Sequence, residues 1–230
     1  MLCHDCPLRS LAFCSAAVAD LSHEDGFVRP RQVTARPRQT IYRKHQKLDD
    51  VILIREGWAL RFTVGANNRR QILSILLPGD VISTASIFKN TLSSSVQTTT
   101  AVSYCAFDRA EFLRFMEKHP GSMKSIMSLC VEDRERCDQQ LIALVTRTAE
   151  ERIAFLMIDI CERMTARGLA HDHEIPFPLT QQHLAEAVGL TQVHVNRVLR
   201  RLREEDLVEI SGGMMRIKDP AAMKSIAQPR

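Results

Sequence analysis

The chain has 230 residues and contains no long apolar run near its N-terminus. A secretory signal peptide needs an uninterrupted apolar core of roughly 7–15 residues, and a membrane-spanning helix needs more. Charged residues and a histidine interrupt every such stretch here, namely Asp5, Arg9, Asp20, His23 and Glu24. We therefore expect neither a signal peptide nor a membrane span, and we expect a cytoplasmic protein without a membrane partner.

The sequence also lacks the motifs by which many enzymes are recognised. It has no phosphate-binding glycine loop and no nucleophile elbow. A cupin-type metal enzyme is the alternative considered, because β-rolls can host metal-dependent oxygenases, but residues 39–107 contain no His-x-His or two-His-one-carboxylate grouping. His171 and His173 lie in a polar connection, where solvated histidines are expected. The sequence therefore does not indicate an enzyme.

Neither sign of charge dominates, with 31 Lys and Arg against 27 Asp and Glu and a net charge of +4. This balance is compatible with a polyanionic partner but does not establish one. The 45% apolar content is enough for a packed core at this length. The seven cysteines do not indicate disulfides in a cytoplasmic chain, so clusters among them are weighed as metal, iron–sulfur or redox sites.

Residues 39–107 break into short runs rich in β-formers. Turn signals at Glu56-Gly57, 65–68 and 78–80 separate these runs, and the later part is rich in Thr and Val. Such regular spacing predicts a barrel or a roll. The expected runs are 39–42, 51–54, 59–64, 71–76 and 94–107.

The pattern changes after Pro120, where apolar residues recur at helical spacing and predict one long helix. Its middle, 132–136, is highly charged, which indicates that the helix packs along a narrow apolar seam. Such a seam often pairs with the same helix of a second chain. An ordinary amphipathic helix folded onto its own domain is the alternative. A second helix is predicted from Ala149 to about Arg167, ending at Gly168.

The region after Thr180 has the signals of a helix-turn-helix. Thr180 can cap a helix over 181–188, Gly189 suits a left-handed turn, and Thr191 can cap a second helix that runs to about Glu204. Arginines and amide side chains occupy the outer face of the second helix, as phosphate and base-edge contacts require. Residues 207–217, about Gly212-Gly213, predict a hairpin wing. A solvated basic helix in a small domain is the alternative.

Three segments resemble the Crp/Fnr family of bacterial regulators: 76–80 (LLPGD), 149–154 (AEERIA) and 179–207. The resemblance implies an α+β fold with a cupin-like, cyclic-nucleotide-binding-like β-roll, a long dimerisation helix and a C-terminal winged helix-turn-helix. The implied boundaries are 1–115 for the sensory β-roll with its N-terminal cysteine arm, 116–147 for the dimerisation helix, and 148–230 for the DNA-binding domain.

The resemblance also implies the partners. A homodimer would bind a near-palindromic site in double-stranded DNA as a regulator of transcription, with RNA polymerase as a further partner. The residues expected to contact DNA are Thr180, Gln181, Thr191, Gln192, Val193, His194, Asn196, Arg197, Arg200 and Arg201. Those expected at the dimer interface are Ile126, Cys130, Asp138, Leu141, Ile142 and Val145.

Asp138 falls where oxygen-sensing members of the family place an acidic residue. Its repulsion against the copy in the second subunit would disfavour dimerisation until an iron–sulfur cluster is present.

Family members that bind cyclic AMP carry a Gly-Glu pair and an Arg-Ser pair that holds the cyclic phosphate. This chain has Ser83-Thr84 and Ser94-Ser95 in their places. A buried phosphate would therefore find no guanidinium partner, and no cyclic AMP is expected.

Oxygen sensors of the family carry an N-terminal cysteine cluster and one distant cysteine in the roll. Cys3, Cys6, Cys14 and Cys105 resemble that set and imply a [4Fe-4S] cluster, whose loss to oxygen would release the N-terminal arm and weaken the dimer. Zinc or thiol redox chemistry is an alternative, and Cys105 also fits a small buried hydrophobe. A regulator without a cluster, constitutive or answering another small effector, is thus a second possibility. The other three cysteines, Cys130, Cys137 and Cys161, are interpreted as packing residues.

The recognition helix departs from the oxygen-sensing branch, which usually reads Glu-x-x-Ser-Arg. Val193 replaces the acidic residue and Asn196 replaces the serine, while Arg197 is kept. The missing carboxylate removes an acceptor for cytosine N4, whereas Asn196 can pair with adenine and Arg197 with guanine. A different operator preference is therefore expected.

Overall fold

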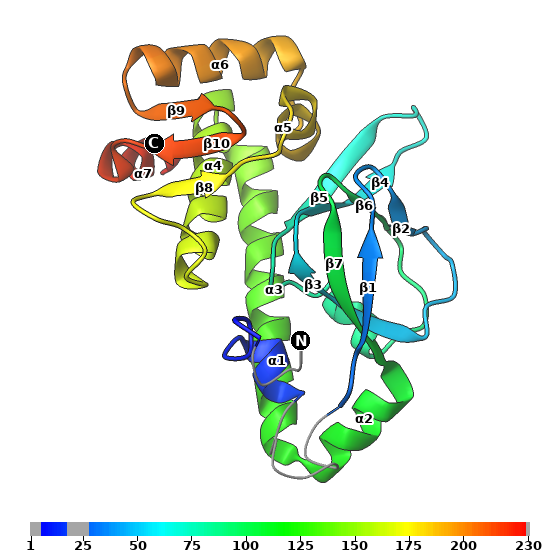
Figure 1. Cartoon of the computed structure of the whole chain (residues 1–230). Helices are drawn as coiled ribbons and strands as arrows, with labels where there is room; N and C mark the ends of the chain where they lie inside the picture. Colours follow the sequence, from blue (N-terminus) through cyan, green and yellow to red (C-terminus); the bar gives the residue numbers. More distant parts are fainter. Residues whose placement is uncertain (1–5, 18–27, 229–230) are drawn as a thin grey trace. The chain divides into compact units, whose positions relative to one another are not determined.

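A computed structural model describes residues 6–17 and 28–228, and Figure 1 traces the chain from its N-terminus in blue to its C-terminus in red. The chain divides into two compact units. Unit 1 comprises Met1–Thr63 and Leu73–Arg136, and unit 2 comprises Val64–Ile72 and Cys137–Arg230. Each unit is described by itself below.

The strands of unit 1 form two antiparallel sheets with the orders β1-β7-β3 and β2-β6-β4-β5. The predicted roll is therefore confirmed. Strand β1, at an edge of its sheet, was not predicted. The strands are β1 (Arg31–Ala35), β2 (Thr40–Tyr42), β3 (Asp50–Glu56), β4 (Ala59–Val64), β5 (Arg70–Leu76), β6 (Ser95–Thr98) and β7 (Val102–Asp108).

Strand β3 is buried on both faces, which explains its unbroken apolar sequence. Successive side chains of a strand point to opposite faces. Val51 and Leu53 therefore pack into one core, with residues of the first helices, while Ile52 and Ile54 pack into a second core. The roll thus has an inner core and a helix-covered core, and β3 contributes to both.

The Leu76–Asp80 segment forms a tight turn in the roll. Gly79 has a φ of 96°, which favours glycine, and the Asp80 carboxylate accepts a hydrogen bond of 2.8 Å from the backbone N–H of Leu77. Asp80 is buried. The family motif noted in the sequence therefore has a structural role, because its carboxylate satisfies a backbone donor of the turn.

The helical segments of unit 1 are α1 (Ala12–Ala16), the short 3-10 helix η3 (Thr84–Ile87) between β5 and β6, α2 (Arg109–Lys118) and the first part of α3 (Pro120–Thr146), whose residues from Cys137 onward belong to unit 2. The long helix predicted after Pro120 is confirmed. Helix α2 was not predicted, and it runs across the implied boundary between 115 and 116.

Within the described residues, unit 2 combines the end of α3 and four further helices with a small sheet of order β8-β10-β9. The predicted hairpin about Gly212-Gly213 is present. Strand β8 was not predicted, because the residues around it were interpreted as a polar connection, and α7 was not predicted either. The elements are α4 (Ala149–Ala166), β8 (Glu174–Pro176), α5 (Gln181–Val188), α6 (Gln192–Glu204), β9 (Val208–Ser211), β10 (Met214–Ile217) and α7 (Pro220–Ala227).

No helix in the part of the chain that the structure describes is both long and apolar enough to cross a membrane.

Candidate DNA-reading helix and cysteine pocket

Helices α5 and α6 form the predicted helix-turn-helix. The Thr180 hydroxyl accepts a hydrogen bond of 3.2 Å from the backbone N–H of His183, which caps α5. Gly189 ends α5 with a φ of 66°, and the Thr191 hydroxyl accepts 3.3 Å from the N–H of His194 to cap α6. The local signals in the sequence therefore identified both helix starts and the turn.

One face of α6 is packed into unit 2. Val195 and Leu202 are fully buried, and Leu199 is nearly so. Leu184 and Val188 of α5 are buried as well, and α5 and α6 are in contact. Because these side chains fix the rotation of α6 about its axis, the opposite face is presented to solvent.

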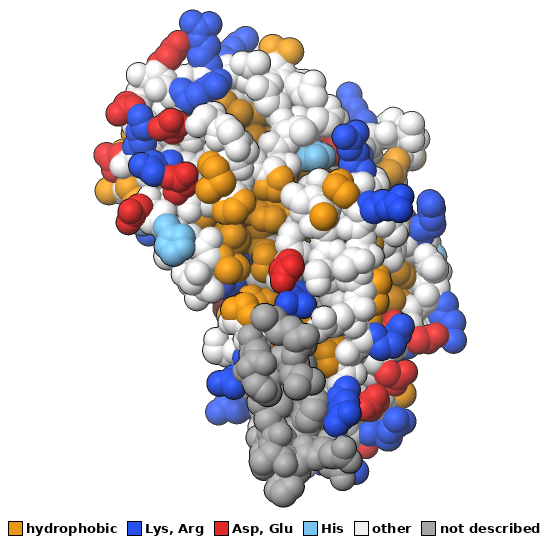
Figure 2. Space-filling model, in the orientation of Figure 1, with side chains coloured by type: hydrophobic (Ala, Val, Ile, Leu, Met, Phe, Trp, Pro, Cys, Tyr) orange, Lys and Arg blue, Asp and Glu red, His pale blue; other side chains and the backbone are white. Residues whose placement is uncertain are grey.

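The expected DNA contacts all lie on exposed positions. The exposed residues are Thr180 and Gln181 at the start of α5, and Thr191, Gln192, Val193, His194, Asn196, Arg197, Arg200 and Arg201 on or beside α6. Figure 2 shows Lys and Arg side chains next to Asp and Glu side chains at the end of unit 2 that carries α6. The face is therefore accessible to a duplex.

The arginines of this face differ in their protein partners. Arg200 pairs with Glu204 at 2.7 Å, and Arg201 pairs with both Glu150 at 2.9 Å and Glu205 at 2.8 Å. Hydrogen bonds to these carboxylates raise the pKa values of Arg200 and Arg201. Arg197 makes no ion pair within the described residues, so its guanidinium is available to an external acceptor.

A chain of side-chain hydrogen bonds ties the two helices together. Gln192 of α6 donates to Gln182 of α5 at 2.5 Å, and Gln182 donates to Glu186 at 2.6 Å. Glu186 also lies 3.5 Å from Arg70, at the start of β5, in the stretch that belongs to unit 2. Sequence reasoning missed this network, because the contacts of Gln192 with Gln182 and of Arg70 with Glu186 depend on how separate elements pack.

The wing is a hairpin of β9 and β10 with a two-residue turn. Gly212 and Gly213 have φ values of 57° and 78°, and both positions favour glycine. Strand β10 pairs with β9 on one side and with β8 on the other. The wing is therefore the end of a three-stranded sheet.

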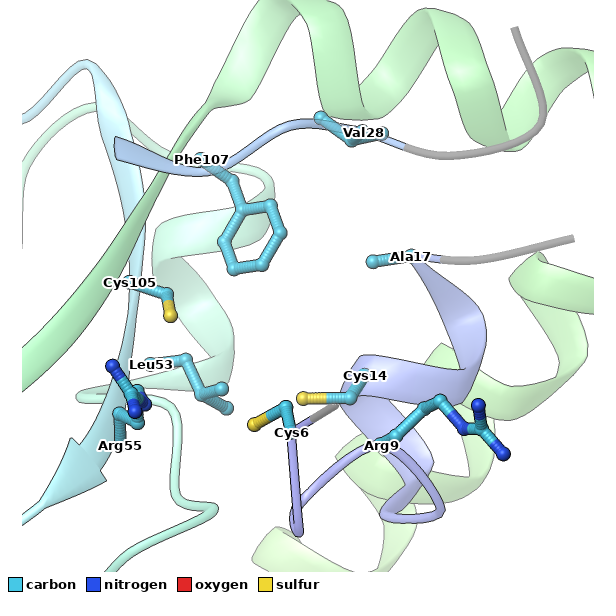
Figure 3. A pocket seen from close by; sticks show the side chains of 9 residues that line it. All are labelled: Cys6, Arg9, Cys14, Ala17, Val28, Leu53, Arg55, Cys105 and Phe107. Atoms are coloured by element: carbon cyan, nitrogen blue, oxygen red, sulfur yellow. The ribbon is translucent and has the colours of Figure 1, made fainter. Parts of the chain in front are cut away.

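Three of the four cysteines expected to bind a metal line one pocket in unit 1. Cys6 and Cys14 come from the N-terminal segment, and Cys105 comes from β7. Figure 3 shows that their sulfur atoms point into the space between α1 and β7. Cys3, the fourth expected ligand, lies outside the described residues. Three cysteines that were grouped from the sequence therefore lie around one pocket in the structure.

The alternation of β7 explains why Cys105 reaches this pocket. Cys105 and Phe107 lie on the same face of the strand and pack into the helix-covered core, with Leu53 paired opposite Cys105. Phe13 of α1 contacts Phe107, with ring centroids 5.2 Å apart, and stacks on Phe112 at 5.1 Å. This aromatic cluster anchors α1, and Cys14 follows Phe13 directly.

Two arginines also line the cysteine pocket. Arg9 precedes α1, and Arg55 follows Leu53 on the same face of β3. The pocket has an empty volume of about 420 Å³, part of it open to solvent. Sequence reasoning missed both arginines, although the alternation of β3 would have placed Arg55 beside Leu53.

Within residues 6–17 and 28–228, no set of three or more His, Cys, Asp or Glu side chains is arranged to hold a metal ion. The donor type suits iron or zinc, since thiolates bind both. The described residues thus supply sulfur donors around one space without a closed coordination shell.

The remaining cysteines lie apart from the pocket. Burial raises the pKa of the Cys161 thiol and of the partly buried Cys130 thiol, and the nearby Asp133 adds to the effect at Cys130. This suits the predicted packing role. Cys137 is exposed, so its interpretation as a packing residue is wrong.

The long helix α3 presents an apolar seam to solvent. Met127 is 62% exposed, Val131 57%, Leu141 61% and Val145 75%. With Arg134 and Asp138 between them, these residues alternate at spacings of four and three, the pattern of a coiled-coil seam. Ile142, also expected at the interface, is exposed beside this seam.

Two residues expected at the dimer interface face the other way. Ile126 is fully buried in the helix-covered core, so its assignment to the interface is wrong. Cys130 is partly buried and packs against the same core. The exposed positions are those of Met127 and Val131, which directly follow Ile126 and Cys130. The sequence alone did not show which residue of each adjacent pair faces solvent.

Comparison with known protein families identifies both parts of the chain. Residues 32–119 match the cyclic nucleotide-binding domain family, and residues 151–226 match the Crp-like helix-turn-helix domain family. The fold and the exposed α6 face thus define a DNA-binding transcription regulator and not an enzyme.

Curated relatives match along almost the whole chain. The transcriptional activatory protein AadR of Rhodopseudomonas palustris is 28% identical, with 96% of this chain and 91% of the relative covered. The nitrogen fixation regulation protein FixK of Bradyrhizobium diazoefficiens is 27% identical, covering 98% and 93%. The solved structure of FixK2 from Bradyrhizobium japonicum shares the fold, with a TM-score of 0.79 at 17% identity over 87% of this chain and 98% of that chain. The two matched domains and these relatives make the chain a transcription regulator of Crp/Fnr type.

Proposed function

We propose that this regulator binds a near-palindromic DNA site as a homodimer, with α6 in the major groove of each half-site. The exposed polar face of α6 carries this proposal, because its buried face fixes which side chains meet the duplex. The exposed seam of α3 supports pairing of two chains. In this assignment 1–115 is the sensory roll, 116–147 the dimerisation helix and 148–230 the DNA-binding domain.

The signal that we propose is a change in redox state or oxygen, received at the cysteine pocket. Cys3, Cys6, Cys14 and Cys105 would hold a [4Fe-4S] cluster, and the shared pocket of the last three supports this set. When bound, such a cluster supplies oxygen-sensitive iron–sulfur chemistry. Relatives at 26% and 25% identity are named anaerobic regulatory proteins, in Pasteurella multocida and Haemophilus influenzae.

The residues of this chain would couple the pocket to the rest of unit 1. Cys14 is anchored through Phe13, which contacts Phe107 and Phe112, and Cys105 is fixed in β7 between β1 and β3. A ligand shared by Cys14 and Cys105 would therefore hold the N-terminal segment against the sheet. Releasing that ligand would free the segment and change the surroundings of α3, whose residues pack against the same core.

Thiol redox chemistry without iron is the second candidate. It would use the same thiols, since Cys6, Cys14 and Cys105 line one pocket. Cyclic AMP is not expected as the effector, because Ser94, which is buried, stands in the place of the phosphate-binding arginine. This expectation stays a prediction.

Anaerobic purification followed by iron and sulfide analysis tests the cluster. A brown protein with about four iron and four sulfide per chain supports it. A colourless, iron-free protein that still binds DNA would contradict the cluster and favour thiol chemistry or a constitutive regulator. RNA polymerase is the further proposed partner, and the cytoplasm, where bacterial DNA lies, is the proposed location.

A further inference from the structure

Helix α6 carries one large apolar side chain that lies mostly in solvent. Val193 is 71% exposed, whereas the other large apolar residues of the helix are buried or half-buried. Every residue of α6 is described, so this contrast holds for the whole helix. Val193 therefore contributes little to the core of unit 2, and its exposure needs another explanation.

Val193 lies among the side chains that are proposed to read base edges. It is the second residue of α6, and Asn196 and Arg197 follow it by three and four positions. Residues at these spacings share one face of a helix. The first turns of a recognition helix make its base contacts, so Val193 is placed toward the groove with them.

The groove offers one kind of surface that suits a valine. An isopropyl group neither donates nor accepts a hydrogen bond, and the adjacent Gln192 is engaged with Gln182 at 2.5 Å. The thymine C5-methyl is the apolar group on a base edge in the major groove. Contact with that methyl would remove both apolar groups from water.

We infer that Val193 is a specificity-determining residue that contacts the C5-methyl group of one thymine in each half-site. The inference rests on the proposed reading of duplex DNA by α6. In this inference Val193 favours thymine. A carboxylate at the same position would instead favour cytosine, whose N4 amino group donates a hydrogen bond.

Deoxyuridine substitution isolates this contact. Wild-type protein would first select its half-site from randomised duplexes, and each thymine in the selected site would then be replaced singly by deoxyuridine, which pairs identically but lacks the methyl group. We expect one position per half-site at which affinity falls about 4-fold, and about 15-fold when both half-sites are changed, since one buried methyl contributes about 0.8 kcal/mol.

Two variants assign the effect to the valine. Val193→Ala should bind the thymine and deoxyuridine duplexes with equal affinity, and Val193→Glu should select cytosine at that position. His194→Ala changes the exposed neighbouring residue. This variant should keep the wild-type ratio of affinities for the thymine and deoxyuridine duplexes, whatever its overall affinity for DNA. Because both side chains are exposed, each variant should fold normally, which a thermal melt confirms.

The outcomes separate this inference from the proposed function. A selected site at which no deoxyuridine weakens binding overturns the inference alone, and so does a deoxyuridine penalty that is undiminished in Val193→Ala. A wild-type protein that selects no sequence overturns the proposed reading by α6 and the inference with it.

Discussion

The guanidinium of Arg201 on α6 lies 2.9 Å from the carboxylate of Glu150 in the first turn of α4. Arg201 is therefore partly neutralised by its own protein, whereas Arg197 makes no ion pair within the described residues. The two arginines should consequently differ in what they contribute to DNA binding.

Glu150→Gln should strengthen binding to random-sequence duplex and steepen its salt dependence. Removing the Glu150 carboxylate leaves Arg201 paired only with Glu205, through its Nε, so that its terminal nitrogens can reach a phosphate, and it takes a negative charge away from the DNA. Each added phosphate contact changes the slope of log affinity against log salt by about −0.9. Gel shifts at several salt concentrations measure this slope. Glu162→Gln on the same helix, where Glu162 pairs with Lys224, is the matched control and should leave the slope unchanged.

Arg197→Ala should weaken binding to the selected site by about 1–3 kcal/mol, since a guanidinium paired with guanine provides discrimination of that size. Binding to random duplex should fall much less. Arg200→Ala, whose guanidinium pairs with Glu204, should instead weaken both duplexes by similar factors. An unchanged operator affinity in Arg197→Ala would contradict the assignment of this residue.

Cys14→Ser and Cys105→Ser should each abolish iron binding in anaerobically purified protein, because each removes a thiolate from the proposed set. Cys137→Ser is the matched control, since this cysteine is exposed and lies outside the pocket. Iron per chain and the visible absorption spectrum are the measurements. Equal iron contents in all three variants would rule out the pocket as the binding site.

Ile126→Ala and Val145→Ala should affect different properties, although both residues were expected at the same interface. Ile126 is fully buried, so its truncation should cost about 2–5 kcal/mol of folding free energy. Val145 is 75% exposed, so its truncation should spare the fold and weaken dimerisation. Denaturant unfolding and sedimentation velocity separate the two effects. A Val145→Ala dimer as tight as the wild type would argue against the seam.

Acidification should destabilise unit 2 through His183. Burial lowers the pKa of this histidine, as does the neighbouring Arg70, while Glu186 opposes the shift. The ring Nδ1 accepts a hydrogen bond of 3.3 Å from the Thr180 N–H, which requires the unprotonated nitrogen. Below about pH 6.5 the unfolded chain binds the proton more readily than the folded chain, so stability falls as the pH falls from there toward the lowered pKa.

His183→Gln tests this dependence, because glutamine can keep the capping acceptor without titrating. The difference in Tm between about pH 7.5 and about pH 5.5 should shrink in the variant. A pH dependence identical to that of the wild type would show that His183 is not its source.

Local signals predicted the helix-turn-helix well. Thr180, Gly189 and Thr191 act on the backbone within a few residues of themselves, so their effect is legible in the sequence. Strand β3 was equally clear, because burial on both faces leaves an unbroken apolar run. Strand β1 was missed because Arg31 and Gln32 are exposed at the edge of its sheet and only Ala35 is buried.

Contacts between segments that lie far apart in the chain could not be predicted from local sequence patterns. The cysteine pocket was expected from the family resemblance, but the anchoring of α1 by Phe13 against Phe107 depends on tertiary packing that no local pattern encodes. Ile126 and Met127 are similar in hydrophobicity, and only the rotation of α3 decides which of them meets the core. The partnership of Arg201 with Glu150 likewise depends on how α4 and α6 cross.

The seam of α3 keeps its apolar side chains at the two ends and places Arg134 and Asp138 in the middle. In the proposed homodimer, a fully apolar seam would favour permanent pairing of the two chains, and such a dimer could not be switched off by dissociation. A charged interruption would weaken the self-association. An effector that favours one state by only a few kcal/mol would then be enough to shift the proposed regulator between a monomer and an operator-bound dimer.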